Sequence, residues 1–209
     1  MRPRRSRAAQ DDGFTLVELL VAIAIMGVIT LPLANLLLSF FLNNSTTTGR
    51  LAESHDQQLA ATYFAQDVAD IGTRDQTSLA FNRSVWPGSF PAGSCGSSSA
   101  AGDQILLLKW DDLTWDGTTQ NVVGRSVAYV RGTSGGETQL RRLFCTGTTQ
   151  QSSIVVVHNL DPGVAPAVVC SPSCTAGAPA TVTLTLGIRS NTGSGAALTV
   201  SLTGDRRQS

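Results

Sequence analysis

Residues 14–42 read FTLVELLVAIAIMGVITLPLANLLLSFFL, and this stretch decides how the chain is organised. It contains one charged side chain, Glu18, and it exceeds the roughly 20 apolar residues that a helix needs to span a bilayer. Four arginines lie before it, and positive charge on that side favours a cytoplasmic N-terminus. We therefore expect a single transmembrane helix here, with everything after it outside the cytoplasm.

Two other kinds of N-terminal segment are rich in apolar residues. A secretory signal peptide has an apolar core of about 7–15 residues that ends at a small-residue cleavage site. Residues 14–42 are too long for such a core, carry a carboxylate near their start and end at no such site. A signal-anchor helix with an incidental glutamate remains the alternative.

The helical pattern continues beyond residue 42 in more polar sequence. Apolar side chains recur there at approximately helical spacing, at Leu51, Leu59, Phe64, Val68 and Ile71. We expect an amphipathic continuation over residues 43–72 that stops at Gly72. Pro32 predicts a kink or local melting because proline lacks a backbone donor, and the Asn, Ser, Thr and Gly of residues 43–49 predict a second weak point.

Beyond Gly72 the sequence changes to short apolar runs separated by turns. Residues 74–103 form a Gly-, Ser- and Pro-rich connection, in which Trp86-Pro87 and Phe90-Pro91 are expected to anchor the loop on a sheet. Strands are expected over residues 104–110, 125–131, 138–145, 154–158, 164–170, 181–189 and 196–203. Turns at residues 132–136 and 191–195 predict two hairpins. The fold class is α+β, a long N-terminal helix packed on an antiparallel β-sheet domain over residues 73–209.

Four cysteines lie in the β-rich part, and an even number after a membrane segment is compatible with disulfides in an oxidising compartment. They permit three connectivities, of which we favour Cys95–Cys145 with Cys170–Cys174. Free thiols remain an alternative. Zinc is disfavoured because a C-x₃-C pair without a nearby histidine supplies too few ligands.

Residues 110–117, WDDLTWDG, place three carboxylates between and beside two tryptophans. Asp111, Asp112 and Asp116 offer the oxygen ligands that calcium prefers. The spacing is not that of an EF-hand, and Asp-Gly is a common turn dipeptide. A solvated turn is the favoured interpretation, so no metal site is predicted.

The sequence offers little support for catalysis or for nucleic-acid binding. His55 and His158 are the only histidines, and no cysteine, serine or carboxylate constellation is tied to either of them. The 15 basic and 15 acidic side chains balance, so there is no overall basic field to attract nucleic acid. We expect no enzyme, no cofactor and no nucleic-acid partner.

The sequence GFTLVE at residues 13–18, between an Arg-rich leader and the apolar run, resembles the class III signal of type IV prepilins and type II secretion pseudopilins. The resemblance implies that a prepilin peptidase removes residues 1–13 by cutting after Gly13 and methylates the new amine of Phe14. It implies that Glu18, the fifth mature residue, acts in filament assembly. The implied partners are that peptidase, other pilin or pseudopilin subunits, an inner-membrane assembly platform and the lipid bilayer.

The residue types suit these roles. Glycine at the scissile bond lacks a β-carbon, so a protease can approach the backbone closely. An unpaired carboxylate in the hydrocarbon region is costly, so Glu18 must be neutralised or paired. Cleavage creates an amine at Phe14, which the Glu18 carboxylate of an adjacent subunit can meet and so set the register between subunits.

The β-rich part, over roughly residues 60–190, looks like the J-type minor pseudopilins and W-type minor pilins, which place a large β domain after the helix. This resemblance implies a low-abundance tip or initiation subunit. A different class of function remains open: a single-pass, membrane-anchored binding domain that is not incorporated into a filament.

Overall fold

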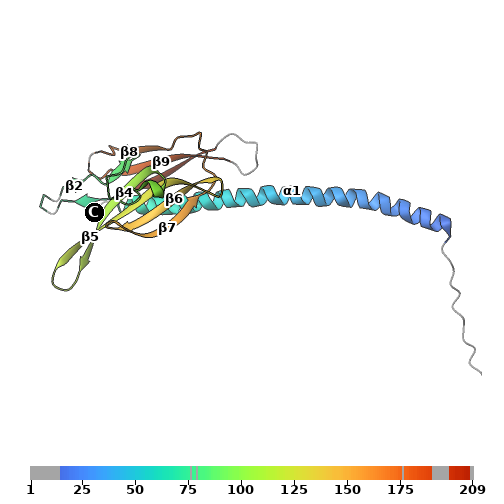
Figure 1. The fold of residues 1–209 in the computed structure, drawn as a ribbon, viewed down its shortest axis with the longest axis horizontal. Helices are drawn as coiled ribbons and strands as arrows, with labels where there is room; N and C mark the ends of the chain where they lie inside the picture. The colour runs from blue at the N-terminus through green and yellow to red at the C-terminus, as the bar shows by residue number, and fades with distance from the viewer. Residues whose placement is uncertain (1–14, 76, 79, 176, 190–197, 208–209) are drawn as a thin grey trace, which may run out of the picture. The chain divides into compact units, whose positions relative to one another are not determined.

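The computed structural model describes residues 15–75, 77–78, 80–175, 177–189 and 198–207. These residues form the helix α1 (Leu16–Ala69), a short 3-10 helix (Ser99–Ala101) and antiparallel strands (Figure 1). The α+β prediction is therefore confirmed. The chain divides into two compact units, Met1–Thr47 and Thr48–Ser209.

The helix α1 is continuous over 54 residues, so the local melting considered at Pro32 does not occur. The kink considered there and the weak point at residues 43–49 stay predictions. Proline removes a single backbone donor, and the hydrogen bonds of the neighbouring turns carry the helix past it. The Thr47 hydroxyl donates to the Asn43 carbonyl one turn earlier, so this polar side chain is satisfied by the backbone of the helix itself. The last helical residue is Ala69, and Gly72 follows with a φ of 146°, close to the predicted stop.

The predicted strands correspond to β4 (Asp103–Trp115), β5 (Gln120–Ser134), β6 (Glu137–Thr146), β7 (Thr149–Val157), β8 (Ala167–Ser171), β9 (Thr181–Ile188) and β10 (Leu198–Asp205). The connection expected over residues 74–103 contains the short strands β1 (Thr73–Arg74), β2 (Phe81–Asn82) and β3 (Val85–Pro87). The turn expected at residues 132–136 joins β5 to β6. The turn expected at residues 191–195 lies outside the described residues, although the strands on either side of it, β9 and β10, pair as predicted.

The strands form three sheets where the sequence suggested one. A five-stranded sheet has the order β3-β4-β5-β6-β7, a three-stranded sheet has the order β10-β9-β8, and β1 pairs with β2. The chain leaves the larger sheet after β7 through residues 158–166, which contain Pro162 and Pro166. Proline cannot donate to a strand ladder, so this connection is unsuited to form a strand itself. The next strand, β8, pairs with β9 in the second sheet.

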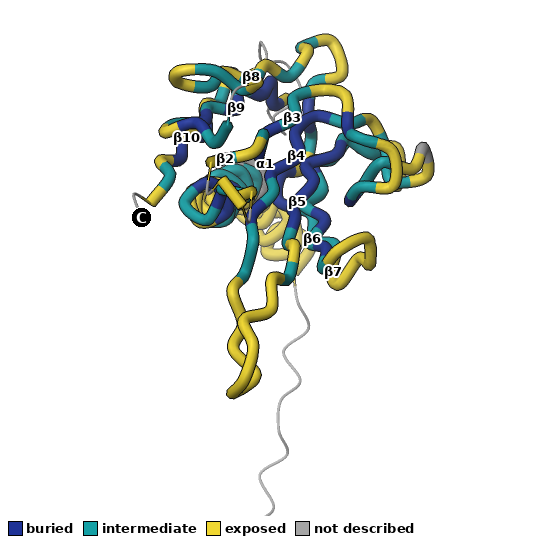
Figure 2. Tube along the Cα trace, turned by 90° about the vertical axis from the view of Figure 1, so that its left-hand side faces the viewer, coloured by how far each residue is buried: buried dark blue, intermediate teal, exposed yellow. Residues whose placement is uncertain are grey.

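The core lies where α1 meets both larger sheets, and Figure 2 shows the buried segments gathered there. Ala60, Phe64 and Val68 of α1 are fully buried. The five-stranded sheet contributes Leu106, Leu108, Val127, Tyr129 and Leu140, and the three-stranded sheet contributes Val182, Leu184 and Leu186. Strand β10 approaches α1 closely at Gly204, where a β-carbon would lie 2.6 Å from that of Val68. The amphipathic part of the helix thus packs on sheet surface, as predicted.

Both favoured disulfides are present in the structure. Cys95 is bonded to Cys145, which ties the loop after β3 to β6, and Cys170 is bonded to Cys174 at the end of β8. The first bridge belongs to a smaller buried cluster that also contains Phe90, with Trp86 packed against it. The loop is therefore anchored on the sheet, as the sequence suggested.

A buried ion pair joins α1 to the five-stranded sheet. Asp67 is 2% exposed, and Arg142 on β6 donates two hydrogen bonds to its carboxylate, one of them 2.7 Å from Nε to Oδ2. The hydroxyl of Tyr129 on β5 donates to the same carboxylate. Burial, reinforced by the charge of Asp67, raises the pKa of Tyr129 well above its ordinary value. Burial alone would lower the pKa of Arg142, but the bonds and charge of Asp67 outweigh it and raise that pKa.

We predict that Asp67→Ala lowers the free energy of unfolding by about 3 kcal/mol, because it leaves the Arg142 charge buried without a partner. Urea unfolding of the detergent-solubilised chain, followed by tryptophan fluorescence, measures this change. The matched variant Asp67→Leu/Arg142→Met removes both charges and should recover most of the loss. A loss below about 1 kcal/mol for Asp67→Ala, the size of an ordinary neutral hydrogen bond, would contradict the prediction.

Candidate functional site

The first turn of α1 is closed by a reciprocal pair of side chains. The Glu18 backbone N–H donates to Thr15 Oγ1 at 3.3 Å, and Glu18 Oε2 accepts from the Thr15 backbone N–H at 3.5 Å. The Thr15 hydroxyl lies 3.4 Å from the same carboxylate oxygen. This arrangement is a capping box, in which Thr15 is the N-cap residue and Glu18 is the third helical residue.

The capping box gives the Glu18 carboxylate a local position within one chain. It lies at the N-terminal end of α1, where the partial positive charge of the helix favours an anion. Sequence analysis assigned Glu18 only to contacts between subunits and missed this role. The signal was present, because Thr-x-x-Glu before an apolar run is typical of a helix start.

Gly13 and Phe14 lie outside the described residues. The structure therefore gives no position for the scissile bond or for the amine that cleavage would create. Their roles, and the pairing of Glu18 with the Phe14 amine, stay predictions.

The surface of α1 after Glu18 is apolar and exposed. Every large hydrophobic side chain from Leu16 to Leu42 is at least half exposed, from 51% at Val21 and Leu33 to 77% at Leu16. The helix is long and apolar enough to cross a membrane. Apolar surface of this extent requires lipid or other apolar helices around it.

Residues 9–34 match the family model described as the prokaryotic N-terminal methylation motif. The chain carries the class III signal of type IV pilins and pseudopilins. The matched residues cover the end of the leader, the junction and the apolar first part of α1, and they stop before the β strands. Neither the curated proteins nor the solved structures gave a match to the chain. The signal supports a type IV pilin-like substrate of prepilin peptidase, and the apolar helix suits membrane anchoring.

The three aspartates considered for calcium do not converge. Asp111 accepts a hydrogen bond from the backbone N–H of Arg74, and Asp112 pairs with Arg125 at 2.9 Å. Asp116 accepts bonds from the turn that follows it, and these bonds lower its pKa. Asp111 and Asp112 are successive residues of β4, so their side chains point to opposite faces of the sheet. Asp116 lies beyond the end of β4 at Trp115. In the described part of the chain no cluster of ligating side chains could hold a metal ion.

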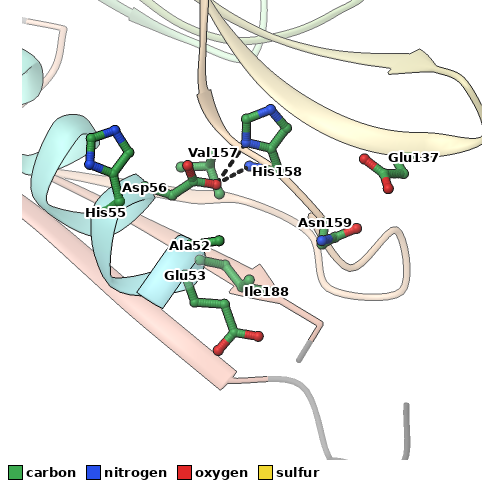
Figure 3. Close-up of a pocket in the computed structure, with 9 residues that line it drawn as sticks. All are labelled: Ala52, Glu53, His55, Asp56, Glu137, Val157, His158, Asn159 and Ile188. Carbon is green, nitrogen blue, oxygen red and sulfur yellow. Dashed lines mark hydrogen bonds and ion pairs between the residues drawn. The ribbon is translucent and has the colours of Figure 1, made fainter. Parts of the chain in front are cut away.

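The two histidines lie at the same pocket, shown in Figure 3. Asp56 on α1 accepts hydrogen bonds from the backbone N–H of His158 at 2.9 Å and contacts its Nδ1 at 2.8 Å. The sequence-based statement that no carboxylate is tied to either histidine is therefore wrong. The sequence could not show this contact, because Asp56 and His158 lie about a hundred residues apart and only the packing of the domain joins them. Among the described residues lining this pocket there is no serine, threonine or cysteine that could act as a nucleophile. The His158–Asp56 contact thus links the end of β7 to α1.

We predict that Thr15→Ala frays the first turn of α1, because the Glu18 N–H loses its acceptor. Loss of an N-cap costs about 1 kcal/mol, so amide exchange at Glu18 should speed up roughly fivefold in detergent micelles. Thr15→Ser keeps the hydroxyl and should exchange like the unmodified chain. Equal exchange rates in the alanine and serine variants would show that the cap contributes nothing.

Proposed function

We propose that the protein is a minor pilin or pseudopilin, a structural subunit that is cleaved after Gly13, methylated at Phe14 and assembled into a filament through α1. The single observation that carries this proposal is the match of residues 9–34 to the N-terminal methylation motif. The exposed apolar surface of α1 supports it, because a filament core of packed helices can replace lipid around that surface.

Glu18 would exchange partners during assembly. In the single chain the carboxylate accepts from Thr15, through contacts of 3.4–3.5 Å that are long for hydrogen bonds. A charged amine at Phe14 of an adjacent subunit is a stronger partner, because two opposite full charges attract each other in addition to the hydrogen bond. The exchange would align one helix against the next and so set the register of the filament.

We further propose that residues 1–13 face the cytoplasm and that the β strands lie outside it. The leader arginines favour this orientation, and the two disulfides suit an oxidising compartment. The partners would be a prepilin peptidase, an inner-membrane assembly platform and neighbouring subunits. The three-sheet β region suits the bulky head of a J-type or W-type minor subunit.

The alternative function is a membrane-anchored extracytoplasmic binding domain that stays outside any filament. The observation that favours it is the short extent of the family match, which ends at residue 34 and assigns nothing to the β strands. Processing alone does not separate the two functions, whereas incorporation into a filament does.

We predict that co-expression with a prepilin peptidase removes residues 1–13 and adds one methyl group to Phe14. Intact-mass and N-terminal peptide analysis of the membrane fraction measure both changes. Gly13→Val places a branched side chain at the scissile bond and should leave the chain uncut. An unmodified chain that still begins at Met1, in cells that process another prepilin, would exclude this function.

We predict that Glu18→Ala is cleaved normally but enters sheared filaments at least tenfold less than the unmodified chain, because the ionic contact that sets the register is gone. Quantitative blotting of filament and membrane fractions measures the ratio. Glu137→Ala removes an exposed carboxylate on β6 and serves as the matched control. Normal incorporation of Glu18→Ala would exclude the pairing mechanism without affecting the cleavage result.

A further inference from the structure

Strand β4 borders β5 along one edge, and its other edge is only partly covered. Strand β3 pairs with that edge at residues 106–108, and the N–H of Lys109 donates to the carbonyl of Ser84 at 2.9 Å. Gly72 then donates to the carbonyl of Lys109 at 3.1 Å and accepts from the N–H of Asp111 at 3.3 Å. In the part of the chain that the structure describes, no backbone bond to this edge follows, so its cover ends at Asp111.

Beyond Asp111 the backbone of β4 faces the open edge at every second residue. The bonds to Gly72 show that the N–H and C=O groups of the odd-numbered residues point away from β5, and the register with β5 is regular from Leu106 to Trp115. Leu113 and Trp115 therefore present both of their backbone groups at the edge. No described residue bonds to those groups. An edge of this kind can accept a further strand.

Large apolar side chains line one face of this open segment. Side chains alternate along a strand, so Leu113 and Trp115 lie on the same face, and Val122 is paired with Leu113 across the hairpin. Leu113 is 62% exposed and Trp115 is 69% exposed. Figure 2 shows the outer hairpin exposed along both strands. The place where a strand is missing is thus also a place where apolar surface is uncovered, as at sites of protein contact.

A fixed negative charge lies at the end of the open segment. The carboxylate of Asp116 accepts bonds from the backbone N–H groups and the hydroxyls of Thr118 and Thr119, and these bonds lower its pKa. All of these donors are uncharged, so Asp116 keeps its negative charge. Asp112 differs, because Arg125 pairs with it at 2.9 Å. A strand that lies beside this edge is therefore favoured if it carries a cation next to Asp116.

A second copy of the chain fits this edge poorly. Two copies can use all of the open backbone groups in an antiparallel arrangement that pairs Leu113 of each copy with Trp115 of the other. That register places Asp112 of one copy directly opposite Asp116 of the other. Like charges directly opposite each other destabilise a sheet. The edge thus favours a different protein.

We propose that the outer edge of β4 binds an extended segment of a partner protein, which adds an antiparallel strand beside residues 113–115. Two apolar residues of that segment, separated by one residue, lie opposite Trp115 and Leu113 and exchange backbone hydrogen bonds with them. A lysine or arginine comes just before them and lies opposite Asp116. The proposal goes beyond filament assembly and does not rest on it, because it involves the β strands alone.

The test uses the full chain in detergent micelles, labelled with ¹⁵N-tryptophan, and follows its three backbone amide signals by NMR. The probe is the peptide acetyl-Lys-Val-Thr-Val-amide, which has the proposed order of basic and apolar residues. The Trp115 signal, assigned by its loss in Trp115→Phe, should move saturably with the peptide at about millimolar concentration. The signals of Trp86 and Trp110, which already pair with Leu107 and Arg125, should stay in place.

Matched peptides separate backbone pairing from side-chain contact. The same peptide N-methylated at both valines has no N–H at those residues, so it should bind at least about tenfold more weakly. The peptide acetyl-Glu-Val-Thr-Val-amide places a second acid beside Asp116, so it should bind several-fold more weakly than the lysine peptide.

Variants of the chain test the charge. Asp116→Asn keeps an oxygen that can accept the bonds of the turn but removes the charge, so the lysine and glutamate peptides should bind this variant alike. Asp103→Asn is the matched control, because Asp103 lies at the other end of β4, where it pairs with Arg131. This variant should keep the preference for the lysine peptide.

Several results would overturn the proposal. A Trp115 signal that stays in place up to roughly 20 mM lysine peptide means that the edge accepts no such strand. Equal binding of the N-methylated peptide shows apolar contact without strand pairing, and equal binding of the glutamate peptide removes the role of Asp116. Movement of all three tryptophan signals shows non-specific binding. A dimer in sedimentation that is lost in Trp115→Thr assigns the edge to a second copy. None of these results bears on the cleavage or filament measurements.

Discussion

A carboxylate within an apolar helix can persist only if it always has a partner. At Glu18 that partner is supplied within the chain by Thr15, through the capping box that begins α1. The position matters as much as the bond, because the N-terminal end of a helix is the one place in the apolar segment where a negative charge is favoured. The helix carries no charged side chain from Leu19 through Leu42. Glu18, at its N-terminal end, is therefore the one charged side chain of the apolar segment that needs a partner.

The same helix serves two physically different environments. Its first part exposes apolar side chains that need lipid or other helices, whereas Ala60, Phe64 and Val68 are sealed between two sheets. The Asp67 carboxylate is buried among strands and must be held by a permanent charge, which Arg142 provides with support from Tyr129. Glu18 and Asp67 thus represent opposite solutions to the same problem. One has weak, replaceable partners, and the other is locked by strong ones.

The β region joins this anchored helix to a surface with its own chemistry. The disulfide between Cys95 and Cys145 fixes the loop after β3. Within the described residues no third strand pairs with the outer part of the β4–β5 hairpin. Leu113 and Trp115 on that hairpin are exposed, and Arg74 and Arg206 stack on Phe81.

The sequence by itself determined the features that depend on neighbouring residues. The apolar run from residue 14, the GFTLVE junction and the period of each strand are local patterns, so the long apolar helix, the signal and the positions of β4–β10 could be read directly. Thr15 and Glu18 were equally local, and their capping box was readable although it was overlooked. The continuity of α1 through Pro32 was not, because the gain from flanking helical turns outweighs one missing donor.

Only the tertiary structure decided what depends on residues far apart in the chain. The partners of Asp67 and the contact of His158 with Asp56 join segments 62 to 102 residues apart, and only the packing shows that consecutive strands divide among three sheets. The Arg74–Phe81–Arg206 cluster likewise combines β1 and β2 with the residue that follows β10. No local pattern specifies such contacts, because they arise when apolar faces are buried together and bring polar side chains to the same place.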